Sequence, residues 1–379
     1  MLVNFLKKFI IVTVFLSFAN CQIALAANWN IPIDWSKVKK ISNKTDLATF
    51  LENKRKNGET FFPIILTKGL TVNDWELRQL CPSAMIESRI VHNDGQNIRM
   101  LCEALDYPGT RVANAYLKGN TDGLNQDELK LYNIAVKIIE EAKKKTTWQA
   151  QEVYFYNEIA KRTTYYTEKD HKNQPHFVTA FGALVKGKAN CQGYTDAFYM
   201  LGKMMGWDVG RMIGKANNGW HMWNTITFTN GRTYCVDVTW GDSDVRFANG
   251  KKYNSYIYLN APVEIMQVTH SWDYSLAPKT IQGSIDDIYS YCAYNDVIRL
   301  NSAEAGLKLL AKKIAKENKT YFSVMVPFSE RYYDSNTAAN YLAKEIDLQK
   351  SHKREIDIAL KIRKYGKYLF YMVDASSRT

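Results

Sequence analysis

The sequence predicts an α+β fold in which a central domain is flanked by two smaller α/β domains. The chain has 379 residues, more than one typical domain contains. Residues 188–242 show a helical pattern followed by a β-hairpin pattern, and the segments on either side alternate helical and strand patterns. We therefore expect flanking domains at 28–119 and 280–379 and a central domain at 120–279.

The start of the chain has the pattern of a secretory signal peptide over residues 1–27. Lys7 and Lys8 precede an apolar run, and residues 24–26 (Ala-Leu-Ala) fit a cleavage site. The run is too short to span a bilayer, so we expect no transmembrane anchor after processing. The expected location is outside the cytoplasm, secreted or in the periplasm or cell envelope. Lipidation at Cys21 is the less favoured alternative, because Asn occupies the preceding position.

Composition and charge narrow the class of protein and its partners. The chain is 46% hydrophobic, which indicates packed globular cores and not disorder. The formal net charge of +12 would suit an anionic envelope polymer. The charges are spread along the chain in short pairs, which favours ordinary solvated helix faces, and an exported protein is not expected to bind nucleic acid.

The cysteines do not suggest a metal site. Without Cys21 their number is odd, which leaves at least one free thiol in an exported chain. Cys81 and Cys102 could form a disulfide, although the sequence cannot decide the pairing. No CxxC pair or Cys/His spacing predicts zinc, so neither a metal nor a cofactor is expected. The remaining cysteines are Cys191, Cys235 and Cys292.

The two flanks look like copies of one small α/β unit. Aligning Thr60 with Thr320 places a capped amphipathic helix, a polar turn and an apolar strand in the same order in both. The alternative is that the two flanks are unrelated, because any two helix-turn-strand units could align this well. In the first copy the predicted helices are 42–57, 72–80 and 97–104, and the predicted strands are 60–66 and 112–117; a final strand at 368–373 closes the second copy.

The central region contains helices, then strands. Apolar periodicity predicts amphipathic helices at 126–145, with Leu129 on its apolar face, and at 148–162. Strands are predicted at 220–228, 233–240 and 253–259, with a loop around residues 269–272.

Cys191 is placed where a thiol becomes reactive. Asn190 is a good N-cap, which puts Cys191 in the first turn of a helix that Gly206 ends. There the helix dipole favours the thiolate. Cys191 shares the buried face of this helix with Tyr194. The alternative is a small buried core residue, the usual role of a free cysteine.

The hairpin brings His221 and Asp237 together in only one register. With a two-residue turn at Asn230-Gly231, Asp237 would lie on the opposite face from His221. A three-residue loop at 229–231, with Gly231 in the left-handed conformation, pairs Phe228 with Arg232 and sets Asp237 beside His221. A catalytic role for both residues therefore requires the longer, irregular loop.

These residues form a candidate set for nucleophilic catalysis. Cys191 would attack, His221 would move the proton, and Asp237 would orient the imidazole. The backbone N–H of Cys191 is an expected oxyanion donor. The candidates for a second oxyanion donor, or for a residue that positions the catalytic side chains, are Gln192, Tyr166, Trp220 and Trp223.

The three motifs resemble the bacterial transglutaminase-like family, whose pattern is Cys-x-Gly-Tyr, His-Ala-Trp-Asn and Val-Asp-x-Thr-Trp-Asp. Here they appear as residues 191–194 (CQGY), 221–224 (HMWN) and 236–241 (VDVTWG). The resemblance implies a papain-like central domain with a Cys191, His221 and Asp237 triad. Gln192 stands where protein-crosslinking transglutaminases usually carry Trp, and Met222 replaces Ala.

We therefore expect an exported cysteine-dependent amide hydrolase, a peptidase or amidase, that forms a thioester acyl-enzyme on Cys191. A protein or peptide substrate is expected, with cell-wall peptide as one option. One alternative is a protein-glutamine transglutaminase. The other is a non-catalytic binding or scaffold protein of the cell envelope that keeps the same fold.

Overall fold

The computed structural model describes residues 32–167, 175–242, 245–246, 252–281, 283, 289, 302–317, 320–349 and 356–377. The predicted signal peptide, Cys21 and Cys292 lie outside the described residues. Contacts along the chain divide it into two units, Met1–Thr225 with Trp272–Ala277, and Ile226–Ser271 with Pro278–Thr379. Within the described part of the chain, no helix is long and apolar enough to cross a membrane.

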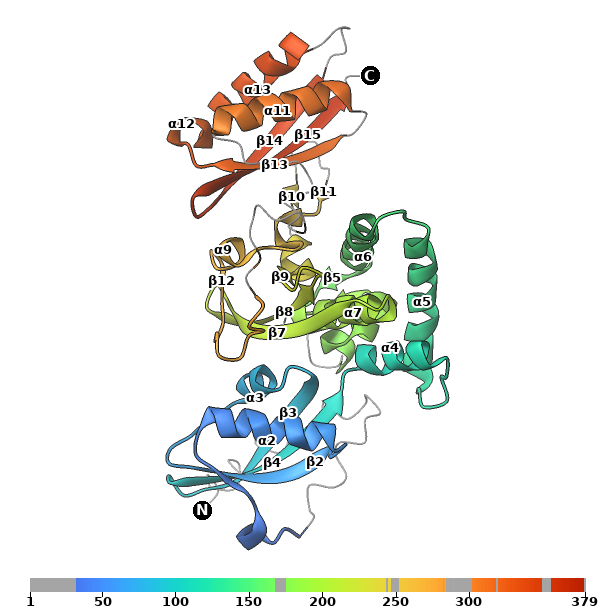
Figure 1. The fold of residues 1–379 in the computed structure, drawn as a ribbon, viewed down its shortest axis with the longest axis vertical. Helices are drawn as coiled ribbons and strands as arrows, with labels where there is room; N and C mark the ends of the chain where they lie inside the picture. The colour runs from blue at the N-terminus through green and yellow to red at the C-terminus, as the bar shows by residue number, and fades with distance from the viewer. Residues whose placement is uncertain are drawn as a thin grey trace, which may run out of the picture. The chain divides into compact units, whose positions relative to one another are not determined.

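The first unit begins with a four-stranded sheet in the order β1-β2-β4-β3. Strand β2 pairs with β1 in parallel and with β4 antiparallel, and β3 and β4 form an antiparallel hairpin. Helices α2 and α3 lie on one face of this sheet (Figure 1), and Asn43 and Asn73 cap them. The elements are η2 (Trp35–Lys37), β1 (Lys40–Ile41), α2 (Lys44–Lys56), β2 (Phe61–Thr67), α3 (Asp74–Leu80), β3 (Ala84–Asn93) and β4 (Asn97–Asp106).

Two predictions in this region are wrong. The predicted helix at 97–104 is strand β4, because Ile98, Met100 and Cys102 alternate and face the core. The predicted strand at 112–117 lies in helix α4 (Pro108–Lys118). Pro108 at the first helical position and Gly119 in the left-handed conformation beyond the end mark the limits of that helix.

Three longer helices follow α4 in the chain, and their predicted limits agree closely with the structure. These are α5 (Gln126–Lys143), α6 (Trp148–Arg162) and α7 (Cys191–Met204). Leu129 does not lie on the buried face of α5, because it is 36% exposed while Leu131, Ile138 and Ile139 are buried. Between α6 and α7 lie β5 (Thr164–Tyr165), η4 (Pro175–Val178), the π-helical turn η5 (Gly182–Lys186) and β6 (Lys188–Ala189), with β5 and β6 paired in parallel.

A second four-stranded sheet has the order β12-β7-β8-β9. The strand predicted at 233–240 ends at Val236, because the Asp237 side chain caps the short helix α8. The loop predicted around 270 contains strand β12. The strand predicted at 253–259 is wrong beyond Tyr253, because the segment turns into the short 3-10 helix η6. The elements are β7 (Asp208–Ala216), β8 (Gly219–Thr227), β9 (Thr233–Val236), α8 (Val238–Gly241), β10 (Val245–Arg246), β11 (Lys252–Tyr253), η6 (Tyr256–Tyr258), α9 (Val263–Met266) and β12 (His270–Ser271).

The loop between β8 and β9 has the predicted three-residue form. Gly231 has a φ of 73°, the left-handed conformation. The Phe228 N–H donates to the Arg232 carbonyl (3.1 Å), and the Gly231 N–H donates to the Phe228 carbonyl (2.9 Å). The prediction that Phe228 pairs with Arg232 is therefore confirmed.

The C-terminal sheet repeats the strand order of the N-terminal one. Its order is β13-β15-β14, all antiparallel, as β2-β4-β3 is in the first sheet. Helices α11 and α13 lie on one face of it (Figure 1), and β2 and β13 alternate buried and half-buried residues identically. The elements are α11 (Ala303–Lys316), β13 (Tyr321–Pro327), α12 (Glu330–Tyr333), α13 (Ser335–Gln349), β14 (Ile356–Tyr365) and β15 (Tyr368–Ser377).

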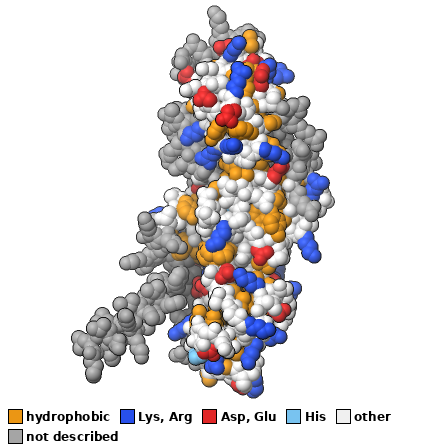
Figure 2. Space-filling model, turned by 90° about the vertical axis from the view of Figure 1, so that its left-hand side faces the viewer, with side chains coloured by type: hydrophobic (Ala, Val, Ile, Leu, Met, Phe, Trp, Pro, Cys, Tyr) orange, Lys and Arg blue, Asp and Glu red, His pale blue; other side chains and the backbone are white. Residues whose placement is uncertain are grey.

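The surface charges do not form a single patch on the face in view. Figure 2 shows Lys and Arg side chains scattered among Asp and Glu side chains there. Several of the described lysines pair with carboxylates one helical turn away, such as Lys130 with Asp127 (3.1 Å). This is the arrangement expected of solvated helix faces.

The hairpin loop gives a first test of the fold. Gly231→Ala should lower the free energy of unfolding by about 1 kcal/mol, because a Cβ is strained in the left-handed conformation although no other atom lies within 4 Å. Gly123→Ala is the matched control, since that glycine is equally open and has no positive φ. Urea denaturation measures both. Equal effects would contradict the three-residue loop.

Candidate functional site

Cys191 is the first residue of helix α7, as predicted. The Asn190 side chain caps the helix by accepting from the Gln192 N–H (3.0 Å). The first N–H groups of a helix have no acceptor within it, and the dipole there favours negative charge. Cys191 is only 4% exposed. Its thiol therefore lies at the positive end of a capped helix and inside the protein.

Close backbone packing explains the residues that follow Cys191. A Cβ on Gly193 would lie 2.6 Å from the Ala189 Cβ and 2.8 Å from the carbonyl oxygens of Phe177 and Thr179. Only glycine lets the start of α7 approach this segment so closely. One residue later the Tyr194 hydroxyl donates to the Thr163 carbonyl (3.1 Å).

Asp196 fixes helix α7 from its buried side. Its carboxylate accepts hydrogen bonds from the Gly109 N–H (3.0 Å) and the Ala180 N–H (2.9 Å), and it pairs with Arg211 at 2.6 Å. Both partners of this ion pair are buried. The carboxylate thus connects α7 to the start of α4, to the segment that precedes α7 and to strand β7.

The surroundings of the Cys191 thiol are mainly apolar. Cys191 belongs to a cluster of buried residues, and two partly buried tryptophans, Trp75 and Trp220, pack against it. Their rings are parallel, with centroids 6.1 Å apart, and Lys215 lies 3.8 Å from the Trp220 ring centre. The other buried members are Met85, Tyr107, Ile213 and Met222. Among the described residues, none forms a hydrogen bond with this thiol.

His221 lies on β8 and is buried. Its ring stacks on Trp223, with centroids 6.0 Å apart and planes 22° apart. Trp223 in turn packs edge-on against Trp272. The aromatic neighbours restrict the rotation of the imidazole ring.

Asp237 uses its two carboxylate oxygens differently. Oδ1 accepts from the Trp240 N–H (3.1 Å) as the cap of α8. Oδ2 lies 3.1 Å from Nε2 of His270, and both side chains are buried. The carboxylate is therefore fixed in position by the backbone of α8 and by a second histidine.

His270 continues this interaction into a buried polar chain. In the neutral imidazole that donates from Nε2 to Asp237, Nδ1 accepts a hydrogen bond from the Thr269 hydroxyl (2.8 Å). Thr269 Oγ1 also lies 3.3 Å from the Tyr258 hydroxyl. Burial raises the pKa of Tyr258 well above its usual range, so this hydroxyl stays protonated.

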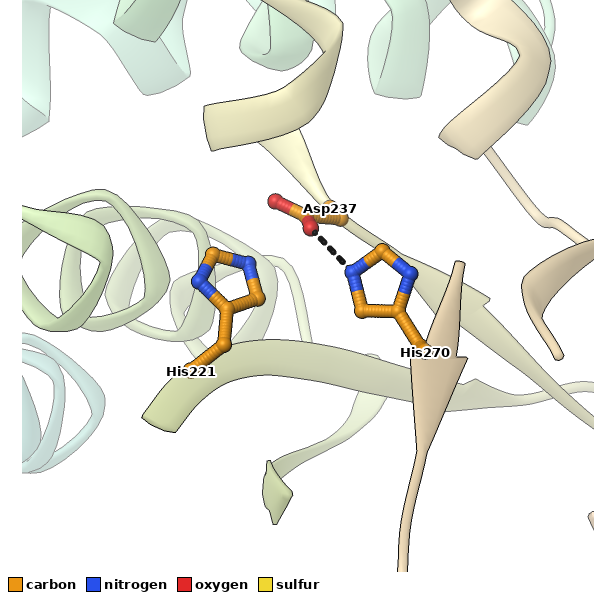
Figure 3. Close-up of side chains that lie close together, drawn as sticks. All are labelled: His221, Asp237 and His270. Atoms are coloured by element: carbon orange, nitrogen blue, oxygen red, sulfur yellow. Dashed lines mark hydrogen bonds and ion pairs between the residues drawn. The ribbon is translucent and has the colours of Figure 1, made fainter. Parts of the chain in front are cut away.

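His221, Asp237 and His270 come together in the structure. One nitrogen of each imidazole and one carboxylate oxygen all lie within 4.8 Å of one another. In Figure 3 the two imidazoles lie on either side of Asp237. Two histidines and a carboxylate are also a donor set that zinc accepts. Cys191 is not part of this group of three.

The predicted oxyanion candidates have different surroundings. The Gln192 side-chain oxygen accepts from Arg78 (3.2 Å), which links it to helix α3. Tyr166 packs beside Phe177. Trp220 lies next to the Cys191 cluster, whereas Trp223 lies under His221. Their roles stay predictions.

None of the described cysteines (Cys81, Cys102, Cys191 and Cys235) forms a disulfide. Cys81 and Cys102 therefore form no disulfide in this structure, and both are buried in the core of the N-terminal sheet. Cys235 is a buried residue of β9.

The sequence analysis missed three residues of the site. His270 lies in a segment predicted as loop, and nothing local marks it as a partner of Asp237. Asp196 follows Cys191 by five residues on α7, where a polar residue on a buried face is the signal that could have been used. Tyr107 precedes Pro108, and the Pro would have marked the start of α4.

No family model matches the sequence, and no curated protein matches it. Its structural neighbours are transglutaminase-like proteins. A TGase crystal structure aligns at 17% identity with a TM-score of 0.27, over 51% of this chain and 53% of that one. The periplasmic domain of TgpA from Pseudomonas aeruginosa aligns at 14% identity and a TM-score of 0.26, over 48% and 69%. A proposed cysteine protease from Cytophaga hutchinsonii aligns at 12% identity and a TM-score of 0.25, over 47% and 64%.

This chain thus spans about half the length of the first of these neighbours. Likenesses of such low identity and TM-score carry no information about a reaction. What the chain can do chemically follows from the placement of its own residues.

The Asp237–His270 contact is testable on its own. His270→Leu removes a donor from a buried carboxylate, which should lower the free energy of unfolding by about 1–3 kcal/mol. His270→Gln keeps an N–H donor and should recover part of that loss. Urea denaturation measures both. If the two variants are equally stable, the contact between His270 and Asp237 does not contribute to folding.

Proposed function

We propose that the protein is an exported cysteine-dependent amide hydrolase, a peptidase or amidase with the triad Cys191, His221 and Asp237. The observation that carries the proposal is the position of Cys191 as the first residue of a capped, buried helix. The proximity of His221 to the fixed Asp237 carboxylate supports it. A papain-like central domain at 120–279, between flanking domains at 28–119 and 280–379, is part of the proposal.

The reaction begins with transfer of the Cys191 proton to His221. The thiolate attacks the amide carbonyl, and the backbone N–H of Cys191 donates to the oxyanion. The C–N bond breaks as His221 returns the proton to the leaving amine, and a thioester remains on Cys191. Water, deprotonated by His221, then attacks the thioester carbonyl. The C–S bond breaks, the carboxylic acid is released, and His221 returns the proton to the Cys191 thiolate.

Asp237 supports this cycle by orienting the His221 ring and by stabilising its positive charge. Because Asp237 also accepts from His270 and from the Trp240 N–H, its carboxylate cannot turn away when His221 becomes protonated. His270 is thus a positioning residue, one step removed from the reacting atoms.

The substrate would be a protein or peptide, with cell-wall peptide as one option. The proposed place of action is the periplasm, the cell envelope or the medium, following from the signal-peptide pattern of residues 1–27. Attraction to an anionic envelope polymer would follow from the net charge of +12, of which +10 remains once Lys7 and Lys8 are removed with the signal peptide.

One observation favours a second candidate, a non-catalytic binding or scaffold protein. Cys191 is only 4% exposed and has mainly apolar neighbours. A substrate must displace some of these neighbours, whereas a scaffold would need no access to the thiol.

Chemical labelling tests the nucleophile. A chloroacetamide attached to a short peptide should alkylate Cys191, and Cys191→Ala should abolish labelling. His221→Ala should slow it by about 10²-fold or more, because the base is lost. Cys81 should stay unlabelled, since burial raises its pKa to about 12. Peptide mapping by mass spectrometry locates the label.

His176→Ala is the matched control, because it removes a half-buried histidine that the proposed chemistry does not use. Labelling spread over several cysteines, or labelling of Cys191 that is as fast in His221→Ala as in the wild type, would refute an activated nucleophile. An unlabelled but folded protein would favour the scaffold.

A primary amine separates hydrolysis from transfer. 4-Nitrophenyl acetate should place an acetyl group on Cys191, and this group should be released mainly as acetate even in the presence of glycine ethyl ester. An amine concentration of about 10 mM, roughly ten times the upper end of enzyme KM values, would give transfer a fair chance. A chelator should not lower the rate, because no metal enters the proposed cycle. Predominant amide formation would indicate a transglutaminase instead.

A further inference from the structure

Tyr107 is a buried side chain whose hydroxyl has no partner. It lies between strand β4 and helix α4, at the N-cap position of α4. The ring is fully buried, and among the described residues no atom forms a hydrogen bond with its hydroxyl. A buried polar group without a partner destabilises the folded state, so it is seldom kept without a use.

The ring is held in position by charged and backbone contacts. The Arg211 guanidinium lies over it, 4.2 Å from its centre, and the same guanidinium pairs with Asp196 at 2.6 Å. Asp196 also accepts from the N–H of Gly109, two residues after Tyr107. The hydroxyl is therefore presented on a fixed scaffold, as a preorganised donor must be.

Tyr107 belongs to the same cluster of buried residues as Cys191. Burial raises the pKa of Tyr107 to about 12, and a negative charge on Cys191 is close enough to contribute to that rise. The hydroxyl thus stays protonated at neutral pH and can donate a hydrogen bond next to the nucleophile.

We propose that the Tyr107 hydroxyl is the second oxyanion donor, acting with the backbone N–H of Cys191. This inference rests on the proposed function. When the thiolate attacks a carbonyl carbon, the C–S bond forms and the C=O π electrons move to oxygen. The unpartnered hydroxyl donates to that oxygen, and the bond is lost again when C=O re-forms and the leaving group departs with its electron pair.

Gln192 is less suited to this role. Its side-chain oxygen accepts from Arg78, and Arg78 is itself bonded to the Ile86 carbonyl, so the amide is directed toward the N-terminal sheet. Tyr107 is supplied by the same N-terminal part of the chain. The segment between β4 and α4 would then complete the catalytic site.

Two reagents separate an oxyanion donor from a structural residue. Acylation of Cys191 by 4-nitrophenyl acetate passes through an oxyanion, whereas alkylation by iodoacetamide displaces iodide directly and forms none. Tyr107→Phe should slow acylation about 100-fold and leave alkylation within a factor of about two. Release of 4-nitrophenolate and mass spectrometry of Cys191 measure the two rates. The melting temperature of Tyr107→Phe should not fall, because the substitution removes no hydrogen bond.

Tyr194→Phe is the matched control, since it also removes a buried hydroxyl, one that donates to the Thr163 carbonyl. It should leave the ratio of the two rates unchanged. If Tyr107→Phe slows both reactions equally, or neither, the inference is overturned. If the wild type is alkylated at Cys191 but is never acylated there, the proposed function fails, and this inference with it.

Discussion

The buried ion pair between Asp196 and Arg211 is the interaction on which the rest of the site depends. Asp196 lies on the helix that begins with Cys191, and its carboxylate also accepts from the N–H groups of Gly109 and Ala180. A carboxylate removed from water must be satisfied in this way, because its desolvation is otherwise too costly. A Cβ on Gly109 would come within 2.5 Å of Asp196, so only glycine allows this contact.

The same pair connects the nucleophile to the N-terminal part of the chain. Arg211 reaches over the rings of Tyr107 and Tyr199, at 4.2 Å and 3.6 Å from their centres. Thus α4, α7 and β7 are positioned around one charge pair. At the other end of the proposed triad, Asp237 has a similar role, because it accepts from α8 and from His270. Each of these buried carboxylates therefore fixes the residues that surround it within its own unit of the chain.

Local sequence signals predicted much of the fold around the candidate site. The Asn190 cap, the apolar spacing of α7 and the Gly231 turn act through neighbouring residues, and the structure agrees with each. Two errors come from local signals that point the other way. The helix predicted at 97–104 conflicts with the alternation of Ile98, Met100 and Cys102, and the strand that contains Cys235 ends early because Asp237 caps α8. His270 and Tyr107 could not be found, since Asp237, which His270 contacts, and Cys191, whose cluster Tyr107 joins, lie far from them in the sequence.

The central claim is that Cys191 forms a covalent acyl-enzyme. Rapid quenching in acid after mixing with 4-nitrophenyl acetate, followed by mass spectrometry of the peptide that contains Cys191, tests it most directly. The account predicts one acetyl group on Cys191 that disappears with time as acetate is released, and none in Cys191→Ser at the same position. Acetylation confined to lysines, or a Cys191 that remains unmodified while the ester is hydrolysed, would contradict it.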